Sequence, residues 1–573
     1  MARIVIAVWI GSFVWPAMAQ QQPEAGRPLF RFGWLSQPKP AQQPPAPWGR
    51  LSAPAELKLG QETVGWLPRG TIVYVKEAQQ DWLLVQAEDK TGWIPTKTVQ
   101  PPQRLAEQVL GFRIAPAVLQ PVGEILSRNG HFAHVGAMGP TLFVVWDGHD
   151  QQTDGIAPAS LILSPRGDRL AYVLKRGEKY CVVLDGQAGP LFDAIVKDTL
   201  LFSPDGRRFA YAAKMGDSHL VVLDGQPQRR FEGIGPGSLV FSPDGQRLAY
   251  VAGRDEKQFV VVDGRVGPRF DGISPGSLVF SPDSQRFAYV AKQAENRFVV
   301  LDGQKSPPFE AIVKDSLLFS PDSRRFAFAA AEGEKHRVFV DGQPDPEFDD
   351  ILPGSLRFSP DSLHLAYIAQ QEGKYVVVMD GQIGPRFFGV AELRFSPDGR
   401  RFAYGASLGV NKQSVVLDGQ PGPEFEGIYA DSLRFSPDSR HVVYAAFVGN
   451  RRFIVINHQP GPAFDAIVKD SLLFSPDGRH FAYGAGRANK RFMILDGRPD
   501  PEFDGVLSPL FTPDSRRFAY EAIQANQRFV VVDGQPGPAC QAVIKGTLHA
   551  RSDGLITYYA IIDRHFWHIV HTP

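Results

Sequence analysis

A segment of 37 to 40 residues recurs eleven times along this chain, and this period constrains the fold more than any other feature. Most copies open with a Ser-Pro-Asp turn, continue with a strand-like run such as RRFAYAA, and then reach an Asp-Gly dipeptide. A twelfth, degraded copy follows near Arg551. A period of about 40 residues predicts a repeat architecture in which each copy forms one supersecondary unit. The serine or threonine that marks each copy stands at Ser127, Ser164, Ser203, Ser242, Ser281, Ser320, Ser359, Ser396, Ser436, Ser475 and Thr512.

Two turns divide each copy into four short strands. In the first, Ser-Pro-Asp-Gly or Ser-Pro-Asp-Ser, proline pre-sets the backbone angle of the second position and the fourth position favours a left-handed residue. The second turn is an Asp-Gly dipeptide, which is among the strongest short signals for a β-hairpin. Only Asn457-His458 departs from it, and asparagine also tolerates this geometry. The aspartates of the second turn are Asp147, Asp185, Asp224, Asp263, Asp302, Asp341, Asp380, Asp418, Asp496 and Asp533.

The strands between these turns are apolar on both faces. Runs such as FVVVDG and FAYVA place aromatic residues on one face and alanine or valine on the other. Both faces must therefore be covered, which predicts an all-β β-propeller of about twelve four-stranded blades. The first strand-like element, residues 110–114, matches a fourth strand, and residues 565–571 match a third strand. The two ends are thus expected to complete one blade together and leave no open edge.

The repeat resembles the TolB-type, WD-repeat-like "PD" propellers of bacteria over residues 108–573. That resemblance implies six-bladed rings and a role in protein binding or scaffolding in the cell envelope. Twelve copies exceed the usual four to eight blades, so we expect two six-bladed rings that divide near residue 345. One large twelve-bladed ring is the alternative, and the uniform spacing of the copies favours it.

The N-terminal residues predict export. Residues 1–19 have a basic start, an apolar stretch and a small-x-small cleavage site, as in a secretory signal peptide. Residues 20–47 form a Gln/Pro-rich linker that cannot bury enough apolar surface to fold. No later segment is long enough to span a membrane as a helix. We therefore expect a periplasmic or secreted protein with no integral membrane segment after cleavage.

Residues 48–100 predict a second, smaller β unit. A Leu-Pro-x-Gly turn at residues 67–70, a Trp-led strand at residues 81–86 and a terminal Gly-Trp-Ile resemble the Src-homology-3-like barrels of exported bacterial proteins. In that family the barrel often binds cell-wall peptide or a protein partner. The resemblance makes Trp82 and Trp93 candidate binding residues, and core aromatics are the alternative reading of both.

Charge and motifs exclude several functions. Lys+Arg and Asp+Glu balance at 61 each, which removes the electrostatic argument for nucleic acid. The chain has no Gly-x-Ser-x-Gly elbow, P-loop, zinc-type cysteine pairing or His-Glu-x-x-His motif. The aspartates of the Ser-Pro-Asp turns recur at one position and are expected to form turns. We expect no catalytic residue, no metal and no cofactor.

The loops between copies carry the candidate binding residues. Those that join a fourth strand to the next first strand read either Pro-Gly-Ser or Val-Lys-Asp. Their lysines, together with an equivalent one in the last copy, are candidates for contact with an acidic partner, and solvated loop charges are the alternative. If the first strand is innermost, these loops and the hairpin loops project from the same face. The lysines are Lys197, Lys314, Lys469 and Lys545.

The sequence therefore predicts an exported, non-enzymatic binding or scaffold protein. Its propeller loops would bind a protein partner in the cell envelope, and its small barrel would bind cell-wall peptide or a second partner. A propeller hydrolase that acts on glycan or peptide is one alternative, and a structural surface protein is another.

Overall fold

A computed structural model describes residues 48–572, apart from short gaps in the first third of the chain. The predicted signal peptide (residues 1–19) and linker (residues 20–47) lie outside the described residues, as do residues 68–70 of the predicted Leu-Pro-x-Gly turn. The gaps are residues 52, 61, 68–71, 80, 88–89, 101–102, 107–108, 117–119, 122–124, 139 and 154.

Residues 48–100 form a seven-stranded antiparallel sheet in the order β3-β2-β6-β5-β4-β1-β7. Its core contains Leu57, Val73, Val85 and Ile94. The expected β unit is therefore present, and its likeness to Src-homology-3-like barrels stays a prediction. The strands are β1 (Trp48–Leu51), β2 (Ala55–Leu59), β3 (Glu62–Leu67), β4 (Ile72–Gln79), β5 (Trp82–Ala87), β6 (Lys90–Pro95) and β7 (Val99–Gln100).

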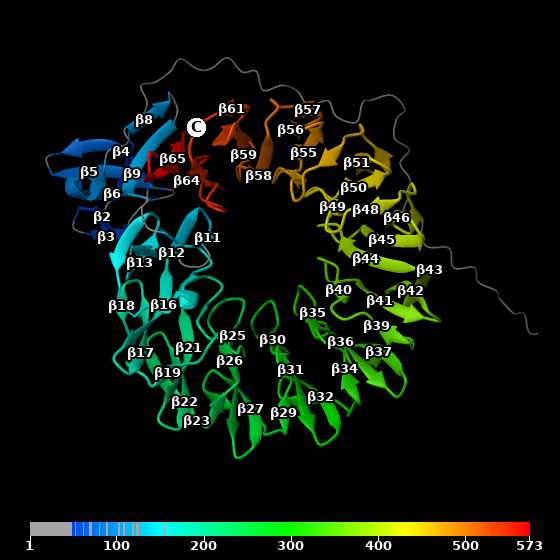
Figure 1. Ribbon diagram of the computed structural model, residues 1–573. Coiled ribbons are helices and arrows are strands. Elements are labelled where there is room, and N and C mark those ends of the chain that lie inside the picture. Colours follow the sequence, from blue (N-terminus) through cyan, green and yellow to red (C-terminus); the bar gives the residue numbers. More distant parts are fainter. Residues whose placement is uncertain are drawn as a thin grey trace, which may run out of the picture. The chain divides into compact units, whose positions relative to one another are not determined.

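The repeat forms twelve antiparallel sheets that follow one another in chain order as the blades of a β-propeller (Figure 1). We number the blades 1 to 12, and each has a long second strand and a long third strand. The second strands are β12 (His131–Met138), β16 (Leu170–Arg176), β21 (Phe209–Met215), β26 (Leu248–Arg254), β31 (Phe287–Gln293), β36 (Phe326–Glu332), β41 (Leu365–Gln371), β45 (Phe402–Gly409), β50 (Val442–Val448), β55 (Phe481–Arg487), β59 (Phe518–Gln524) and β64 (Ile556–Ile562). The third strands are β13 (Thr141–Trp146), β17 (Lys179–Leu184), β22 (Ser218–Leu223), β27 (Lys257–Val262), β32 (Asn296–Leu301), β37 (Lys335–Val340), β42 (Lys374–Met379), β46 (Lys412–Leu417), β51 (Arg451–Ile456), β56 (Lys490–Leu495), β60 (Gln527–Val532) and β65 (His565–His571).

The first strand of most blades is divided into two short pieces. In blade 4, β24 (Gly233–Ile234) and β25 (Val240–Phe241) both pair with β26, at its end and at its beginning. Gly233 and Ile234 follow the fourth strand of blade 3 closely in the sequence, but they cross to the next blade and pair with β26. The reason is Phe231, which ends β23 (Gln226–Phe231), the outermost strand of blade 3, so that the chain turns inward directly after it.

The predicted turns are confirmed. Asp224 and Gly225 both have left-handed backbone angles, with φ of 50° and 79°, which is the type I′ geometry that matches strand twist. Asn457 and His458 adopt the same geometry, with φ of 47° and 66°, so the departure from Asp-Gly leaves the hairpin unchanged.

The two ends of the repeat complete blade 12, as predicted. Its third strand, β65, pairs with β64 on one side and with β9 (Val109–Pro116) on the other. β9 therefore supplies the fourth strand from the beginning of the repeat, and β8 (Gln103–Ala106) adds one more strand outside it. Neither end of the array leaves the long strands of blade 12 unpaired.

The expected division into two six-bladed rings is wrong. Around residue 345 the blades pack without a break, because Ala327 and Val338 of blade 6 share one core cluster with Phe348 and Tyr367 of blade 7. Blade 12 instead packs on blade 1, where Phe132 contacts Tyr559 at a ring separation of 4.9 Å. Each blade thus packs on the next in one closed series of twelve, which was the alternative reading. The physical reason is that the repeat continues across residue 345 with its full set of core residues.

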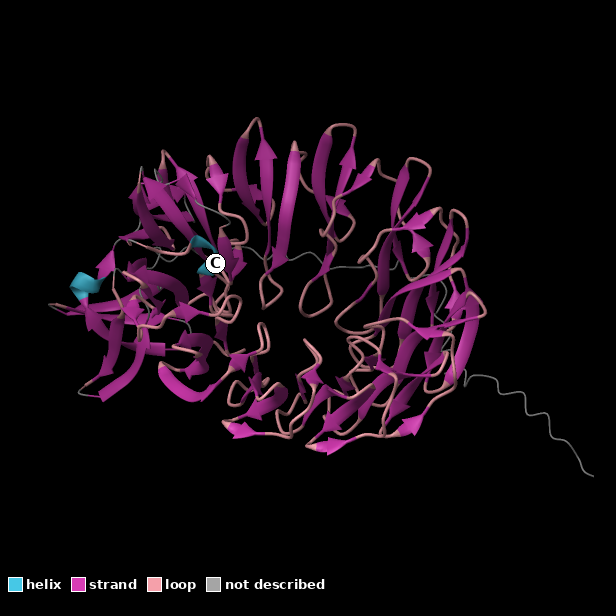
Figure 2. Ribbon diagram, turned by 60° about the horizontal axis from the view of Figure 1, so that its bottom comes forward, coloured by secondary structure: helices cyan, strands magenta, loops and turns pink. Residues whose placement is uncertain are grey.

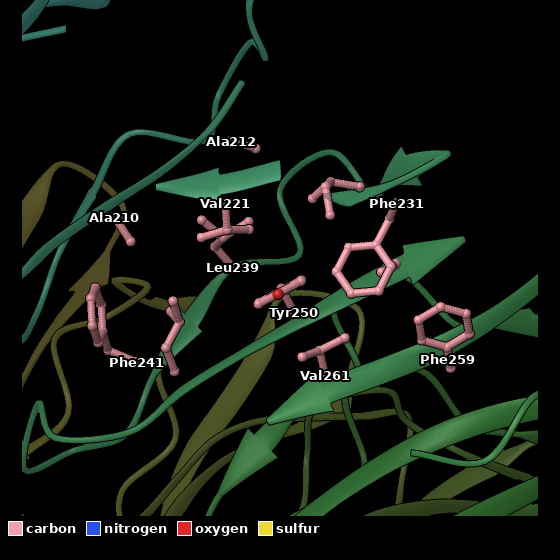
Figure 3. Packing of buried hydrophobic residues seen from close by; sticks show 12 residues of the cluster. Ala210, Ala212, Val221, Phe231, Leu239, Phe241, Tyr250, Phe259 and Val261 are labelled. Atoms are coloured by element: carbon pink, nitrogen blue, oxygen red, sulfur yellow. The ribbon is translucent and has the colours of Figure 1, made fainter. Parts of the chain in front are cut away.

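Most interfaces between blades combine small residues from one blade with large residues from the next. Ala210, Ala212 and Val221 of blade 3 lie against Tyr250 and Phe259 of blade 4 (Figure 3). Burying one such large side chain stabilises the fold by roughly 1.5–3 kcal/mol. The same exchange of small for large recurs at most interfaces and, with the aromatic packing of Phe132 on Tyr559 between blades 1 and 12, it fixes both the order and the spacing of the blades.

The marker serine or threonine is a buried hydrogen-bonding group at the start of blades 2 to 11. In blade 5, the hydroxyl of Ser281 donates to Asp283 at 2.5 Å and accepts the backbone N–H of Arg286 at 2.9 Å. Asp283 also accepts the N–H of Gln285, and these bonds hold the pKa of its carboxyl below the usual range. The turn aspartates therefore form turns, as predicted. The Arg286 side chain extends to the Arg324 carbonyl of the next blade at 3.1 Å.

Replacing this serine is expected to destabilise the propeller measurably. Ser281→Ala leaves the buried N–H of Arg286 without a partner, which costs about 1–3 kcal/mol. Ser281→Thr is the matched control, because Thr512 makes the same two hydrogen bonds in blade 11. Urea unfolding followed by tryptophan fluorescence measures both variants. Equal destabilisation by alanine and threonine would contradict this role of the hydroxyl.

Candidate functional site

The inner rim of the propeller is built by the loops that divide the first strands. In blade 4, residues 235–239 leave the sheet opposite the middle of β26, and the Ser238 hydroxyl accepts the N–H of Val251 at 3.1 Å. That hydroxyl replaces the carbonyl that an undivided strand would present. Figure 2 shows such loops, in pink, on the inner side of the blades. We call this surface the inner rim; its loops are residues 157–161, 196–200, 235–239, 274–278, 313–317, 352–356, 429–433, 468–472 and 544–548.

The sequence pattern predicted that these loops and the hairpin loops project from the same face. The structure does not place them on one face. The hairpin between β26 and β27 lies at the end of the blade, whereas residues 235–239 lie opposite its middle. The difference arises because both short strands pair with one long strand. Blades 8 and 11 depart from this plan, since β44 (Gly389–Phe395) and β58 (Gly505–Phe511) are continuous first strands.

All four predicted lysines lie on the inner rim, in different blades. The side chains of Lys197 and Lys314 are almost fully exposed, and each ammonium lies 3.9 Å from the carboxylate of the next residue, Asp198 or Asp315. Such exposed pairs contribute little energy and leave little net charge. Lys469 and Lys545 lie in blades 10 and 12, so the structure brings none of the four lysines together in one blade.

Three arginines that the sequence pattern did not single out follow one another along the inner rim. Arg357, Arg394 and Arg434 occupy the same first-strand position in blades 7, 8 and 9, and all three are exposed. Arg357 donates to the carbonyl oxygens of Gly354 and Leu356 at 2.7 Å. Within the described part of the chain, none of the three guanidinium groups forms an ion pair. Other blades have an apolar residue here: Ile162, Leu201, Val240, Val279, Leu318, Leu473 and Leu510.

We call Arg357, Arg394 and Arg434 the arginine arc, and a neighbouring carboxylate fixes the loop beside it. The Glu392 carboxylate of blade 8 accepts the backbone N–H groups of Asp431 at 2.6 Å and Leu433 at 3.1 Å. The blade 9 loop is thereby fixed beside Arg434. A pocket of about 40 Å³ follows between blades 9 and 10, where Arg434 and Lys469 are among the lining residues. It has room for only a few water molecules, far less than the roughly 300–1,000 Å³ of a small-molecule site.

Two carboxylates that break the repeat lie on first or second strands of the propeller, and both already have structural partners. Glu392 holds the blade 9 loop, as described above. Glu521, on the second strand of blade 11, is buried and paired with Arg528 of the adjacent strand. The two lie in different blades, and among the described residues no cluster of three or more histidine, cysteine or acidic side chains is arranged to hold a metal ion. The geometry of these groups does not assemble a reaction site.

The two predicted tryptophans lie on the outer face of the small sheet. Trp93 pairs with Leu84, and Trp82 lies two residues from Leu84 on the same strand and therefore on the same face. Trp82 is 39% exposed and Trp93 is half-buried, and neither belongs to the core cluster of this unit. The reading of both as core aromatics is therefore wrong. Trp66, 60% exposed on β3, is a further surface aromatic that the sequence reading missed.

Comparisons with known proteins show no close relative. No family model matches the chain, and no curated protein matches it. Among solved structures, a eukaryotic initiation factor is 16% identical, with a TM-score of 0.33, and covers 59% of this chain and 96% of its own. TolB from Acinetobacter baumannii is 17% identical, with a TM-score of 0.21, over 52% of this chain and 80% of its own. The propeller domain of the Trilobed protease from Pyrococcus furiosus is 12% identical, with a TM-score of 0.23, over 48% and 95%.

These likenesses are too weak to carry an argument about function. The assignment to the β-propellers rests instead on the pairing and packing of the twelve sheets described above. No helix among the described residues has the length and apolar character needed to cross a bilayer.

Proposed function

We propose that this protein is a non-enzymatic binding or scaffold protein of the cell envelope, and that it binds an acidic protein partner at the inner rim of blades 7 to 9. The observation that carries the proposal is the arginine arc. Arg357, Arg394 and Arg434 stand in consecutive blades at a position where blades 2 to 6, 10 and 11 have leucine, isoleucine or valine. Packing does not call for an arginine there, so these three residues are free to serve a ligand.

The chemistry of the arc favours carboxylates. A guanidinium presents five donors in a planar fork that matches a carboxylate in two parallel hydrogen bonds. One exposed ion pair contributes little, but three adjacent cations on rigid strands act together on one partner. Arginine is also enriched among the residues that dominate protein interfaces. An acidic segment of a protein that lies across blades 7 to 9 would meet all three.

The cellular setting is part of the same proposal. The signal-like residues 1–19 support export to the periplasm or beyond. The outer-face tryptophans Trp66, Trp82 and Trp93 would give the small sheet a separate surface for cell-wall peptide or a second protein. Lys469 lines the pocket beside Arg434 together with Asp431 and Asp470, and these residues continue the charged surface into blade 10.

Reversing the charge of the arc is expected to abolish partner capture. The triple variant Arg357→Glu, Arg394→Glu, Arg434→Glu removes charge-assisted hydrogen bonds worth about 1.5–3 kcal/mol each, so affinity should fall at least tenfold. Capture of envelope proteins by the immobilised chain, quantified by mass spectrometry, measures the loss.

A second triple variant controls for net charge. Arg207→Glu, Arg324→Glu and Arg479→Glu make the same change at exposed arginines of the Ser-Pro-Asp turns. The control should capture the same partner as the unmodified chain. Equal loss in both variants, or capture that survives in the first, would contradict the proposal.

A further inference from the structure

A carboxylate joins each blade to the hairpin of the next blade at most crossings of the propeller. Asp349, which follows Phe348 between blades 6 and 7, accepts the N–H of Glu372 at 2.6 Å and the ammonium of Lys335 at 2.6 Å. Seven crossings have such a bond to a backbone N–H, at 2.6 to 2.9 Å. The pairs are Gly216 to Asp193, Asp255 to Glu232, Ala294 to Asp271, Glu372 to Asp349, Gly449 to Glu426, Ala488 to Asp465 and Ala525 to Asp504.

The crossing from blade 7 to blade 8 has a phenylalanine in place of this carboxylate. Phe388 follows Phe387 as Asp349 follows Phe348, and 61% of Phe388 is exposed. The strand that leads into the blade 8 hairpin, β45, is one residue longer than β41 of blade 7, and this hairpin carries Val410, which is 92% exposed. The backbone N–H of Phe388 donates to the carbonyl of Ser407 at 2.9 Å, so Phe388 lies beside the strand that leads into this hairpin, at the hairpin end of the blades.

The hairpin of blade 9 adds a third exposed apolar residue. Val448 ends β50 and is 43% exposed, whereas polar residues end the corresponding strands of blades 7, 10 and 11, at Gln371, Arg487 and Gln524. We call Phe388, Val410 and Val448 the apolar patch. It lies in the same three blades as the arginine arc but on a different part of them, at the hairpin end instead of the inner rim.

The patch has a cation whose usual partner is missing. Lys179, Lys335 and Lys490 each pair with the carboxylate at their own crossing, at 2.6 to 2.8 Å. Lys374 of blade 7 has no such carboxylate, and its ammonium lies 3.0 Å from the centroid of the Phe388 ring. Among the described residues it forms no ion pair. An apolar surface with an uncompensated cation beside it complements a ligand that combines an apolar side chain with carboxylates.

We propose that the apolar patch and Lys374 dock a segment of the partner protein in which an apolar residue is flanked by Asp or Glu. This deepens the proposed function and rests on it, because it names the chemistry of a protein partner for the same three blades. Binding would remove the Phe388 ring and the two valines from water and return a carboxylate to Lys374. A second copy of this chain is disfavoured, since a symmetric contact would bring two Lys374 ammonium groups together.

Substitution of Phe388 by the residue that the other blades carry gives a clean test. Phe388→Asp removes the apolar ring and offers a carboxylate to Lys374 and to the blade 8 hairpin, as Asp349 does in blade 7. The variant is therefore expected to unfold at the same temperature as the unmodified chain or above it. Leu191→Asp, at another exposed apolar residue outside the patch, is the matched control.

The probe is a displayed library of random dodecapeptides panned on the immobilised full chain. We expect enrichment of peptides with one aromatic or aliphatic residue between acidic residues. Their affinity should fall at least tenfold with Phe388→Asp, fall with Lys374→Glu, and stay unchanged with Leu191→Asp. The triple arginine variant of the inner rim should retain them, so a failure of the arginine arc is read separately from a failure of the patch.

Four results would overturn the inference. One is enrichment of peptides without acidic residues, and another is binding that survives Phe388→Asp. The third is a concentration-dependent dimer in analytical ultracentrifugation that Phe388→Asp abolishes, because it would assign the patch to a second copy of this chain. Absence of any enriched peptide would also contradict it.

Discussion

Ending the chain at Ile562 is expected to abolish the cooperative folding of the propeller. The truncation removes β65, which is the strand that joins β64 to β9 and thereby connects the two ends of the repeat. Phe566, Trp567 and Ile569 are buried in this strand. Together with Val570 they contribute roughly 6–12 kcal/mol of burial, at about 1.5–3 kcal/mol for each side chain. That is comparable with the whole stability of a typical domain, about 5–15 kcal/mol.

The control for this truncation is a chain that ends at His571. It keeps β65 and loses only the last two residues, although the carbonyl of Thr572 accepts a hydrogen bond from Arg517 at 3.0 Å. Differential scanning calorimetry should show one cooperative transition for the control and none, or a broad one at much lower temperature, for the shorter chain. Matching transitions in both would contradict closure through β65 and β9.

Acidification from neutral pH is expected to weaken the packing of blade 12 on both of its neighbours, because His134 of blade 1 lies near Phe566 of blade 12, and His571 of blade 12 lies beside Gly537 of blade 11. Burial lowers the pKa of His134 to about 4, and burial together with the nearby Arg517 lowers the pKa of His571 to about 4. The unfolded chain binds these protons at an ordinary pKa of about 6.5. The folded state binds fewer protons than the unfolded state between pH 6.5 and 4, so stability falls as the pH is lowered through this window. A shift of one pKa unit corresponds to about 1.4 kcal/mol of stability. The difference between a pKa of about 6.5 in the unfolded chain and about 4 in the folded state therefore makes each histidine account for about 3 kcal/mol at most.

Thermal unfolding at pH 7 and pH 5 tests this expectation, because hydrogen bonds hold the pKa of the Ser-Pro-Asp aspartates, such as Asp244, Asp283 and Asp322, below the usual range, so these carboxylates stay ionised at both pH values. His134→Tyr is the informative variant, since tyrosine fills the same position in blade 3, at Tyr211. It should show a smaller fall in unfolding temperature from pH 7 to pH 5 than the unmodified chain. An identical fall would show that His134 does not carry the pH dependence.

The fold could be predicted largely from the sequence because the same turn residues and strand patterns recur from copy to copy. The Asp-Gly and Ser-Pro-Asp turns require left-handed residues at fixed places, and the structure has them there. The offset between the first and last strands predicted the pairing of β9 with β65. The number of rings could not be derived in this way, because both arrangements begin with a fourth strand and end with a third. Packing across residue 345 decides it, and packing is not visible in the turns.

The candidate site was harder to predict, for a different reason. The lysines were predicted to bind a partner because they recur in loops. In the structure, Lys197 and Lys314 lie beside carboxylates of their own loops. The informative residues are those that break the repeat. Arg394 stands where other copies have an apolar residue, and Phe388 stands where they have an acidic one. A comparison of the copies position by position would have found both. Their exposure and missing partners required the structure.

Site-specific photo-cross-linking in intact cells tests the central claim most directly. The photoreactive residue p-benzoylphenylalanine is placed at position 394 in the arginine arc or at position 197, an exposed rim position in blade 3. Irradiation should yield one discrete protein adduct from position 394 and none from position 197, because only blades 7 to 9 hold the partner. Equal adducts from both positions, or no adduct from position 394, would contradict partner binding at the inner rim of blades 7 to 9.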